Sequence, residues 1–234
     1  MKRVYAGAIV SAVVSALWAG AVLWFKYRFL AFACYGAMIV AFPFASLAHE
    51  LGHMLFGAVS GIKAVPEFSL FGPSSCKLVP RTDKNLRMRV LFTAFGGISV
   101  NFVFCIAGAL GLLVTEAAFL SVFLPASSYL FWLNAGQAEF SDGKTDGLVI
   151  SEFYNNDDSA KVAVAVLTAQ AKMLKGARVE ELDRNLLFGQ PVIREDDPAF
   201  IALTQLKRDY CSAVGDAEGE KALNERLEQL KEYL

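Results

Sequence analysis

Four long apolar runs dominate the first 150 residues of the chain. They cover residues 4–25, 29–59, 91–114 and 117–133, and short polar segments separate them. An α-helix needs about 20 residues, with a range of about 17 to 25, to cross the hydrocarbon core of a bilayer. The first run is longer than the apolar part of a signal peptide, so we expect a retained helix there. The pattern predicts a polytopic membrane helix bundle with about four transmembrane helices.

The polar segment between the second and third runs has a different character. Residues 63–89 contain Pro66, Pro73 and Pro80 between short apolar stretches that alternate with polar residues. Short strands with turns fit such a segment best. We therefore expect a short β-hairpin-like insert after the second helix.

After residue 150 the apolar residues recur at the spacing of amphipathic helices. This spacing predicts helices over residues 158–175, 179–187, 198–214 and 218–234, and the last two are expected to form a helical hairpin. The chain is thus predicted to be all-α apart from the insert. It would have a transmembrane core over residues 1–150 and a helical tail over residues 151–234.

Composition supports a membrane protein. Of the 234 residues, 55% are hydrophobic and only 19% are charged, which is unusual for a soluble globule. Up to residue 146 there are 11 Lys and Arg against 7 Asp and Glu, and from residue 147 onward 11 against 16. The predicted core is therefore basic and the predicted tail acidic.

The positive charges also predict an orientation. Two of those near the ends of the predicted spans, Lys26 and Arg28, lie on one side of the membrane. The eight on the other side are Lys2, Arg3, Lys63, Lys77, Arg81, Lys84, Arg87 and Arg89. This bias predicts a multi-pass protein of the cell membrane with its N- and C-termini in the cytoplasm.

Other sequence features limit the classes of partner that the protein is expected to bind. The lipid bilayer is an expected partner, whereas the chain has neither a glycine-rich phosphate loop nor a basic-aromatic pattern for nucleic acid. The four cysteines show no C-x-x-C spacing, so we interpret them as buried or incidental thiols. Nothing in the sequence indicates an oligomeric state.

One motif in the second apolar run points to chemistry. The segment His49-Glu50-Leu51-Gly52-His53 contains both histidines of the chain. On a helix, residues four apart lie on one face, so both imidazoles can bind one Zn²⁺ ion. Ionisable groups cost roughly 2.5 to 3.5 kcal/mol at the centre of a membrane helix, and a chain keeps them mainly where they serve a site. In an H-E-x-x-H helix the glutamate is the general base for a zinc-activated water, which predicts hydrolysis with Glu50 in that role.

A catalytic zinc usually has three protein ligands, and no third histidine exists here. Asp142 and Asp146 are the candidates, because both follow the fourth apolar run on the side of the membrane where the motif lies. Each precedes a glycine, so each is also compatible with a turn aspartate. Asn101, near the start of the third run, is a candidate for a hydrogen bond across the bundle or for contact with a substrate or transition-state carbonyl.

The order of these motifs resembles that of the site-2 protease family of intramembrane zinc metalloproteases (peptidase family M50). That family has H-E-x-x-H, then G-P-x-x-N, then N-x-x-P and a following Asp-Gly. The corresponding segments here are residues 49–53, residues 97–101 and residues 134–137 with a following Asp-Gly. Ile98 and Gln137 stand where the family usually has proline.

The resemblance implies a function and a ligand set. The protein would be an intramembrane zinc metalloendopeptidase that cuts membrane-associated proteins or peptides, with His49, His53 and one aspartate on the zinc. The usual spacing from Asn134 selects Asp142 as the third ligand. More divergent members, with Thr/Ser-Asp-Gly and a soluble helical tail, resemble residues 145–150, and on that ground we favour Asp146. The alternatives are a catalytically inactive membrane scaffold of the same fold and a metal transporter, and a transporter predicts more intramembrane carboxylates and histidines.

Overall fold

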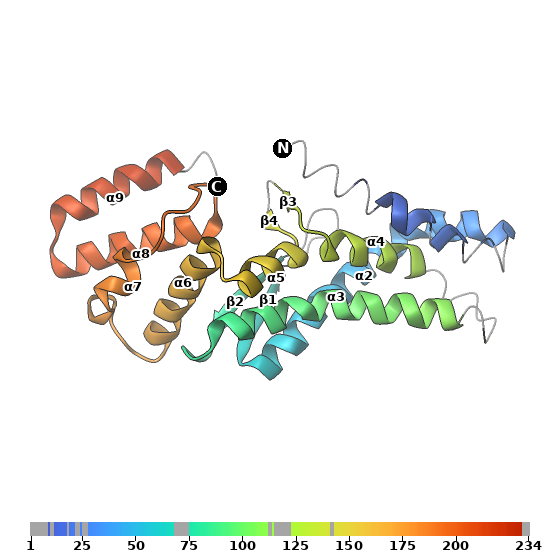
Figure 1. Ribbon diagram of the computed structural model, residues 1–234, viewed down its shortest axis with the longest axis horizontal. Coiled ribbons are helices and arrows are strands. Elements are labelled where there is room, and N and C mark those ends of the chain that lie inside the picture. Colours follow the sequence, from blue (N-terminus) through green and yellow to red (C-terminus); the bar gives the residue numbers. More distant parts are fainter. Residues whose placement is uncertain are drawn as a thin grey trace. The chain divides into compact units, whose positions relative to one another are not determined.

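The computed structural model describes residues 9, 12–17, 19–21, 24, 28–67, 75–111, 114, 123–140 and 143–230, and they are mainly helical (Figure 1). They belong to two compact units. The first comprises Met1–Ser60, Ala64–Leu78 and Leu91–Ser151, and the second Gly61–Lys63, Val79–Val90 and Glu152–Leu234. The division after residue 151 lies close to the predicted boundary, but the second unit also takes two short segments that we had assigned to the core.

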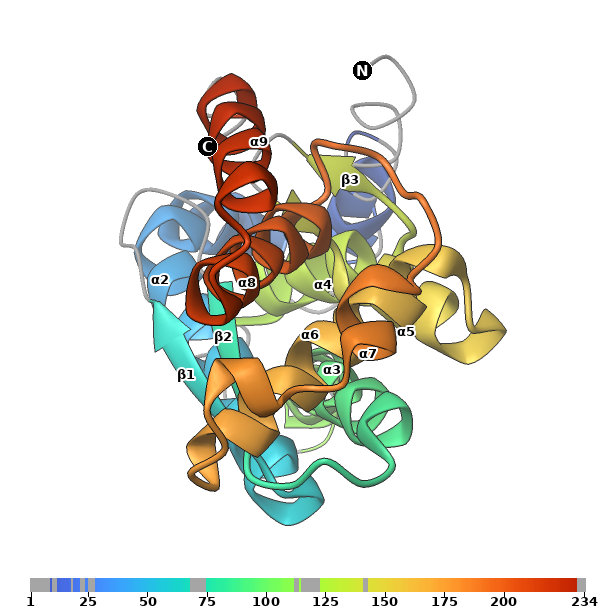
Figure 2. The ribbon, with the colours of Figure 1, turned by 90° about the vertical axis from the view of Figure 1, so that its left-hand side faces the viewer.

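The predicted motif helix and the predicted insert are both present. Helix α2 spans Arg28–Ser60 and continues through Pro43. Strands β1 (Ile62–Glu67) and β2 (Ser75–Pro80) follow it and pair as a two-stranded sheet, seen side by side in Figure 2. Of the first predicted helix, residues 12–17 and 19–21 are helical, and much of the rest lies outside the described residues.

Helix α3 spans Leu86–Leu110 and crosses α2 at backbone contact. A Cβ atom placed on Gly52 would lie 2.5 Å from the carbonyl oxygen of Gly96, and one placed on Gly96 would lie 2.4 Å from that of Gly52. Only glycine fits at both positions, because neither backbone has room for a side chain. Gly96 and Gly52, which lies inside the motif, thus allow the two helices to approach closely.

Substituting Gly52 is expected to destabilise the protein through this contact. In Gly52→Ala the new methyl group meets the Gly96 backbone, which cannot move aside as a flexible side chain would. We expect a loss of about 1 to 3 kcal/mol, seen as a lower thermal midpoint in detergent. Ala58→Val adds bulk at an exposed position of the same helix and is the matched control. Equal midpoints for wild type and Gly52→Ala would contradict the contact.

Helix α4 (Phe123–Ala135) packs along α2. Ala41 and Ala45 of α2 are buried against Ala126 and Leu130 of α4. Pro125 lies in the first turn of this helix, where a proline removes no intrahelical hydrogen bond. The predicted start at residue 117 lies outside the described residues.

Among the described residues one helix, Leu86–Leu110, is long and apolar enough by length and composition to cross a membrane. It begins five residues before the predicted start at residue 91, because Leu86 and Val90 are buried while Arg87 donates hydrogen bonds to the carbonyl oxygens of Phe153 and Tyr154. The polar residues that marked a loop in the sequence are thus part of the helix.

After α4 come the short strands β3 (Glu139–Phe140) and β4 (Gly143–Lys144), which pair antiparallel, and helix α5 (Asp146–Asn155). The C-terminal helices then follow in the predicted order, except that residues 179–187 form two short elements. These are α6 (Asp158–Leu174), a 3₁₀ turn (Val179–Glu181), α7 (Arg184–Phe188), α8 (Pro198–Val214) and α9 (Ala217–Leu230).

The second unit has its own hydrophobic core. Residues from α6, α7, α8 and the segment before α7 form it: Val162, Val166, Ala169, Leu182, Leu187, Leu203 and Leu206. Helices α8 and α9 pack as the predicted hairpin (Figure 1), joined through Gly215 at a positive φ of 79°. The break inside the predicted helix 179–187 occurs because Leu182 turns into this core and the Asp183 side chain caps α7.

Candidate metal centre

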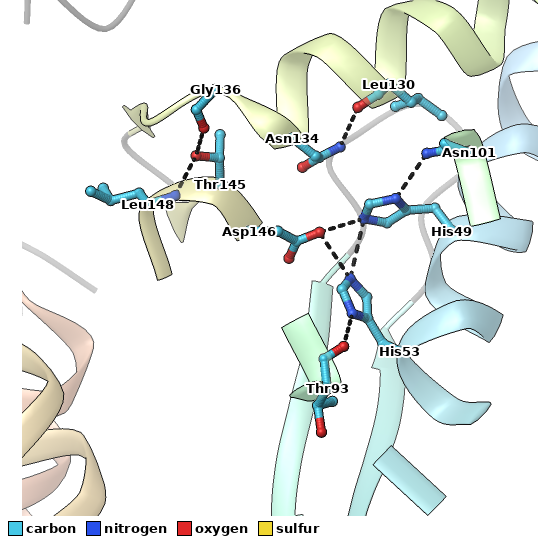
Figure 3. A network of polar contacts seen from close by, with 10 residues as sticks. All are labelled: His49, His53, Thr93, Asn101, Leu130, Asn134, Gly136, Thr145, Asp146 and Leu148. Atoms are coloured by element: carbon cyan, nitrogen blue, oxygen red, sulfur yellow. Dashed lines mark hydrogen bonds and ion pairs between the residues drawn. The ribbon is translucent and has the colours of Figure 1, made fainter. Parts of the chain in front are cut away.

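His49 and His53 lie one turn apart on the buried face of α2. Their exposed fractions are 5% and 6%, and the two Nε2 atoms face each other at 3.2 Å. Figure 3 shows both rings directed at the same point. The spacing of four residues therefore places both imidazoles on one face of the helix, as predicted.

Asp146 reaches the same point from the N-terminus of α5. Its Oδ2 atom lies 3.1 Å from Nε2 of His49 and 3.3 Å from Nε2 of His53 (Figure 3). Burial opposes the charge on Asp146, but hydrogen bonds and charges of the two histidines outweigh burial and lower the pKa of this carboxyl to about 2. Asp146 is therefore an anionic group at neutral pH.

Thr145 holds the start of α5 in place. Its hydroxyl donates to the carbonyl oxygen of Gly136 at 2.6 Å and accepts from the amide of Ala138 at 3.0 Å. The same oxygen lies 3.4 Å from the amide of Leu148, where it caps the helix. A Cβ atom on Gly147 would lie 2.4 Å from the carbonyl oxygen of Ala135, so the start of α5 lies directly against the end of α4. These contacts of Thr145 and Gly147 fix the position of Asp146, the residue between them.

The three donor atoms are close enough together to bind one metal ion. They all lie within 4.8 Å of one another. In a tetrahedral site with bonds of about 2.0 Å, neighbouring ligand atoms are roughly 3.3 Å apart, and the three separations here are 3.1, 3.2 and 3.3 Å. With both imidazoles unprotonated, two ring nitrogens and a carboxylate oxygen would repel one another at such distances, and a shared metal ion would offset that repulsion.

Gly97 of α3 faces this point. A Cβ atom at position 97 would lie 2.5 Å from Nε2 of His49 and 2.6 Å from Nε2 of His53. Any side chain there would displace the two ligands. The glycine thus leaves the space into which the ligand atoms point.

Both ring nitrogens that face away from this point have partners on α3. Nδ1 of His53 lies 2.9 Å from the carbonyl oxygen of Thr93, and Nδ1 of His49 lies 2.9 Å from Nδ2 of Asn101 (Figure 3). Outer partners of this kind set the tautomer and the ring orientation of histidine ligands.

Glu50 follows His49 on α2 and is 4% exposed. Among the described residues, no hydrogen-bond partner lies within reach of its Oε2 atom. Burial, followed by a hydrogen bond and charge of Glu50, raises the pKa of the Cys76 thiol on β2. Cys76, which we had interpreted as an incidental thiol, therefore lies beside the predicted general base and stays protonated there.

The structure brings together His49, His53 and Asp146, with Asn101 beside His49, and buries Glu50, the next residue in the chain after His49. Asp142, the alternative third ligand, lies outside the described residues. The sequence reasoning missed the Thr93 carbonyl, the space that Gly97 leaves for the site, and the hydrogen bonds of Thr145, which entered it only as part of the Thr-Asp-Gly resemblance. Of these, only Thr145 left a signal, because a threonine followed by Asp-Gly and then apolar residues is typical of a helix start.

Comparisons of the chain with protein-family models, with curated proteins and with solved structures find no match.

Proposed function

We propose that the protein is a zinc metalloendopeptidase of the membrane. The observation that carries this proposal is the group of Nε2 of His49, Nε2 of His53 and Oδ2 of Asp146, separated by 3.1 to 3.3 Å on an H-E-x-x-H helix. Two histidines and one carboxylate are a ligand set of catalytic zinc sites, which leave a further position for water. The resemblance to the site-2 protease family supports the same assignment.

The residues of this chain would divide the reaction among themselves. His49, His53 and Asp146 would hold Zn²⁺, which supplies Lewis acidity that lowers the pKa of water and polarises a peptide carbonyl. Glu50 would take the proton of the attacking water and pass it to the departing amide nitrogen. The Oε2 atom of Glu50 is buried and lacks a hydrogen-bond partner among the residues that the structure describes, which suits this role because the atom is available to a water molecule.

We place this chemistry within the bilayer region. Helix α2 has 33 residues and is therefore roughly 50 Å long, which exceeds a hydrocarbon core of about 30 Å. Large apolar side chains are exposed along both helices that carry the site: Val40, Phe44, Leu55 and Val59 on α2, and Phe102, Val103, Ile106 and Leu110 on α3. Lipid contact would account for this surface. A multi-pass bundle with about four spans and cytoplasmic termini remains part of the proposal.

A site at this depth points to a substrate class. Peptide bonds that reach it would belong to membrane-associated proteins or peptides, and the bond that is cut must be free of helical hydrogen bonds. The small sheet of β1 and β2 lies next along the chain from the motif helix.

The test is metal-dependent hydrolysis by the purified protein in detergent, with dye-labelled casein and synthetic transmembrane-segment peptides as probes. We expect about one zinc per chain by elemental analysis. Hydrolysis should be lost with 1,10-phenanthroline and restored by one equivalent of Zn²⁺. The isomer 1,7-phenanthroline, which does not chelate, is the matched control.

Two results would count against the proposal. Hydrolysis that persists after complete removal of zinc would mean that the site is not the catalytic one. A protein that holds one zinc but cuts none of the probes would favour the inactive membrane scaffold.

A further inference from the structure

Asn101 lies behind His49, on the side away from Asp146 (Figure 3). It comes from the middle of α3, has an exposed fraction of 0%, and places its amide 2.9 Å from Nδ1 of His49. With no exposed surface and with the ring of His49 between it and Asp146, it is poorly placed for substrate contact, which we had considered for it. Its side chain instead contacts His49, one of the proposed metal ligands.

The position of the proton on a metal-binding imidazole decides whether Asn101 must donate or accept this hydrogen bond. A neutral imidazole that binds metal through Nε2 carries its proton on Nδ1, so Nδ1 is a donor and needs an acceptor. An asparagine amide offers either group to the same neighbour, because rotation by 180° exchanges its oxygen and its nitrogen. Oδ1 of Asn101 is buried and lacks a hydrogen-bond partner among the described residues. Rotation of the amide brings this oxygen to Nδ1 of His49.

We propose that Asn101 is a positioning residue that accepts a hydrogen bond from Nδ1–H of His49 through Oδ1 and thereby keeps Nε2 of His49 free to bind metal. The inference rests on the proposed zinc site. His53 provides an internal comparison, because its Nδ1 atom faces the backbone carbonyl of Thr93 at 2.9 Å, and a carbonyl can only accept. Both ligands would thus have the same tautomer, one fixed by the backbone and one by a side chain.

Two substitutions separate this role from simple packing. Asn101→Asp keeps an acceptor and, when ionised, cannot donate, and a carboxylate partner raises the basicity of the imidazole, so zinc affinity should be at least that of wild type. Asn101→Leu keeps the branching at Cγ and has no acceptor, and loss of such an outer partner typically lowers metal affinity 10- to 100-fold. Cys105→Ala, one turn further along the same face of α3, changes packing at another buried position and is the matched control.

The measurement is the zinc dissociation constant at pH 8, by competition with a chromophoric chelator, with thermal midpoints recorded for every variant. Wild-type or tighter affinity in Asn101→Asp with weaker binding in Asn101→Leu supports the proposal. Wild-type affinity in both variants overturns it and leaves the proposed function standing. Weaker binding in Asn101→Asp than in wild type also overturns it, because a donor would then be what His49 needs. This second result decides the matter even where Asn101→Leu does not fold. A wild-type protein that binds no zinc overturns both this inference and the proposed function.

Discussion

Asp146→Asn is expected to lower zinc affinity by roughly 100-fold or more, whereas Asp142→Asn should leave it unchanged. The amide keeps the size of the carboxylate but loses its charge, and a zinc ligand set of two neutral imidazoles then lacks its anion. Oδ2 of Asp146 lies within 3.3 Å of both Nε2 atoms, so this charge acts directly on the site. Elemental analysis after dialysis and a competition titration measure the effect.

Asp142→Asn is the matched control, because it makes the same chemical change at the other Asp-Gly pair of the segment. The reverse result, with zinc lost only in Asp142→Asn, would show that Asp142 is the ligand and that the start of α5 is not where zinc binds. Zinc kept by both variants would mean that the two histidines bind it without either aspartate.

The sequence predicted one half of this site well, because that half lies on one helix. His49 and His53 are four residues apart, so helical geometry alone puts their rings together. The third ligand lies on a separate helix far along the chain, and spacing left two aspartates open. Asp146 is held at the site by its neighbour Thr145, whose hydroxyl bonds to the chain at Gly136 and Ala138 and caps α5. Such a tertiary contact has no periodic signature.

The same distinction applies to the glycines and to the helix bounds. Gly52 occupies a variable position of the motif, so the motif alone does not call for glycine there. The need for glycine follows from the backbone of Gly96, which lies against it in the folded protein. Helix α3 was predicted to begin at residue 91 because Arg87 and Arg89 interrupt the apolar pattern, and the Arg87 contacts that make the earlier start possible involve residues 153 and 154. Helix α8 has the predicted bounds, since proline at its start and glycine after its end are local signals.

Glu50→Gln is expected to abolish hydrolysis while zinc stays bound. Glutamine has the shape of glutamate but cannot accept the proton of a water molecule, and general base catalysis contributes roughly 10² to 10⁴ in rate. Glu50 does not belong to the three ligands, so the metal content should remain at wild-type level. Rates on dye-labelled casein and zinc per chain, measured on the same samples, give both quantities.

Glu67→Gln is the matched control for this substitution, because it makes the same change at an exposed glutamate of β1. The neighbouring thiol needs its own control: Cys76→Ala removes the side chain that contacts Glu50 and should keep hydrolysis. Loss of zinc in Glu50→Gln would mean that this carboxylate holds the metal centre together and is not acting as its base. Full hydrolysis in a zinc-loaded Glu50→Gln protein would remove Glu50 from the reaction altogether, and with it the reason for placing peptide hydrolysis at this helix.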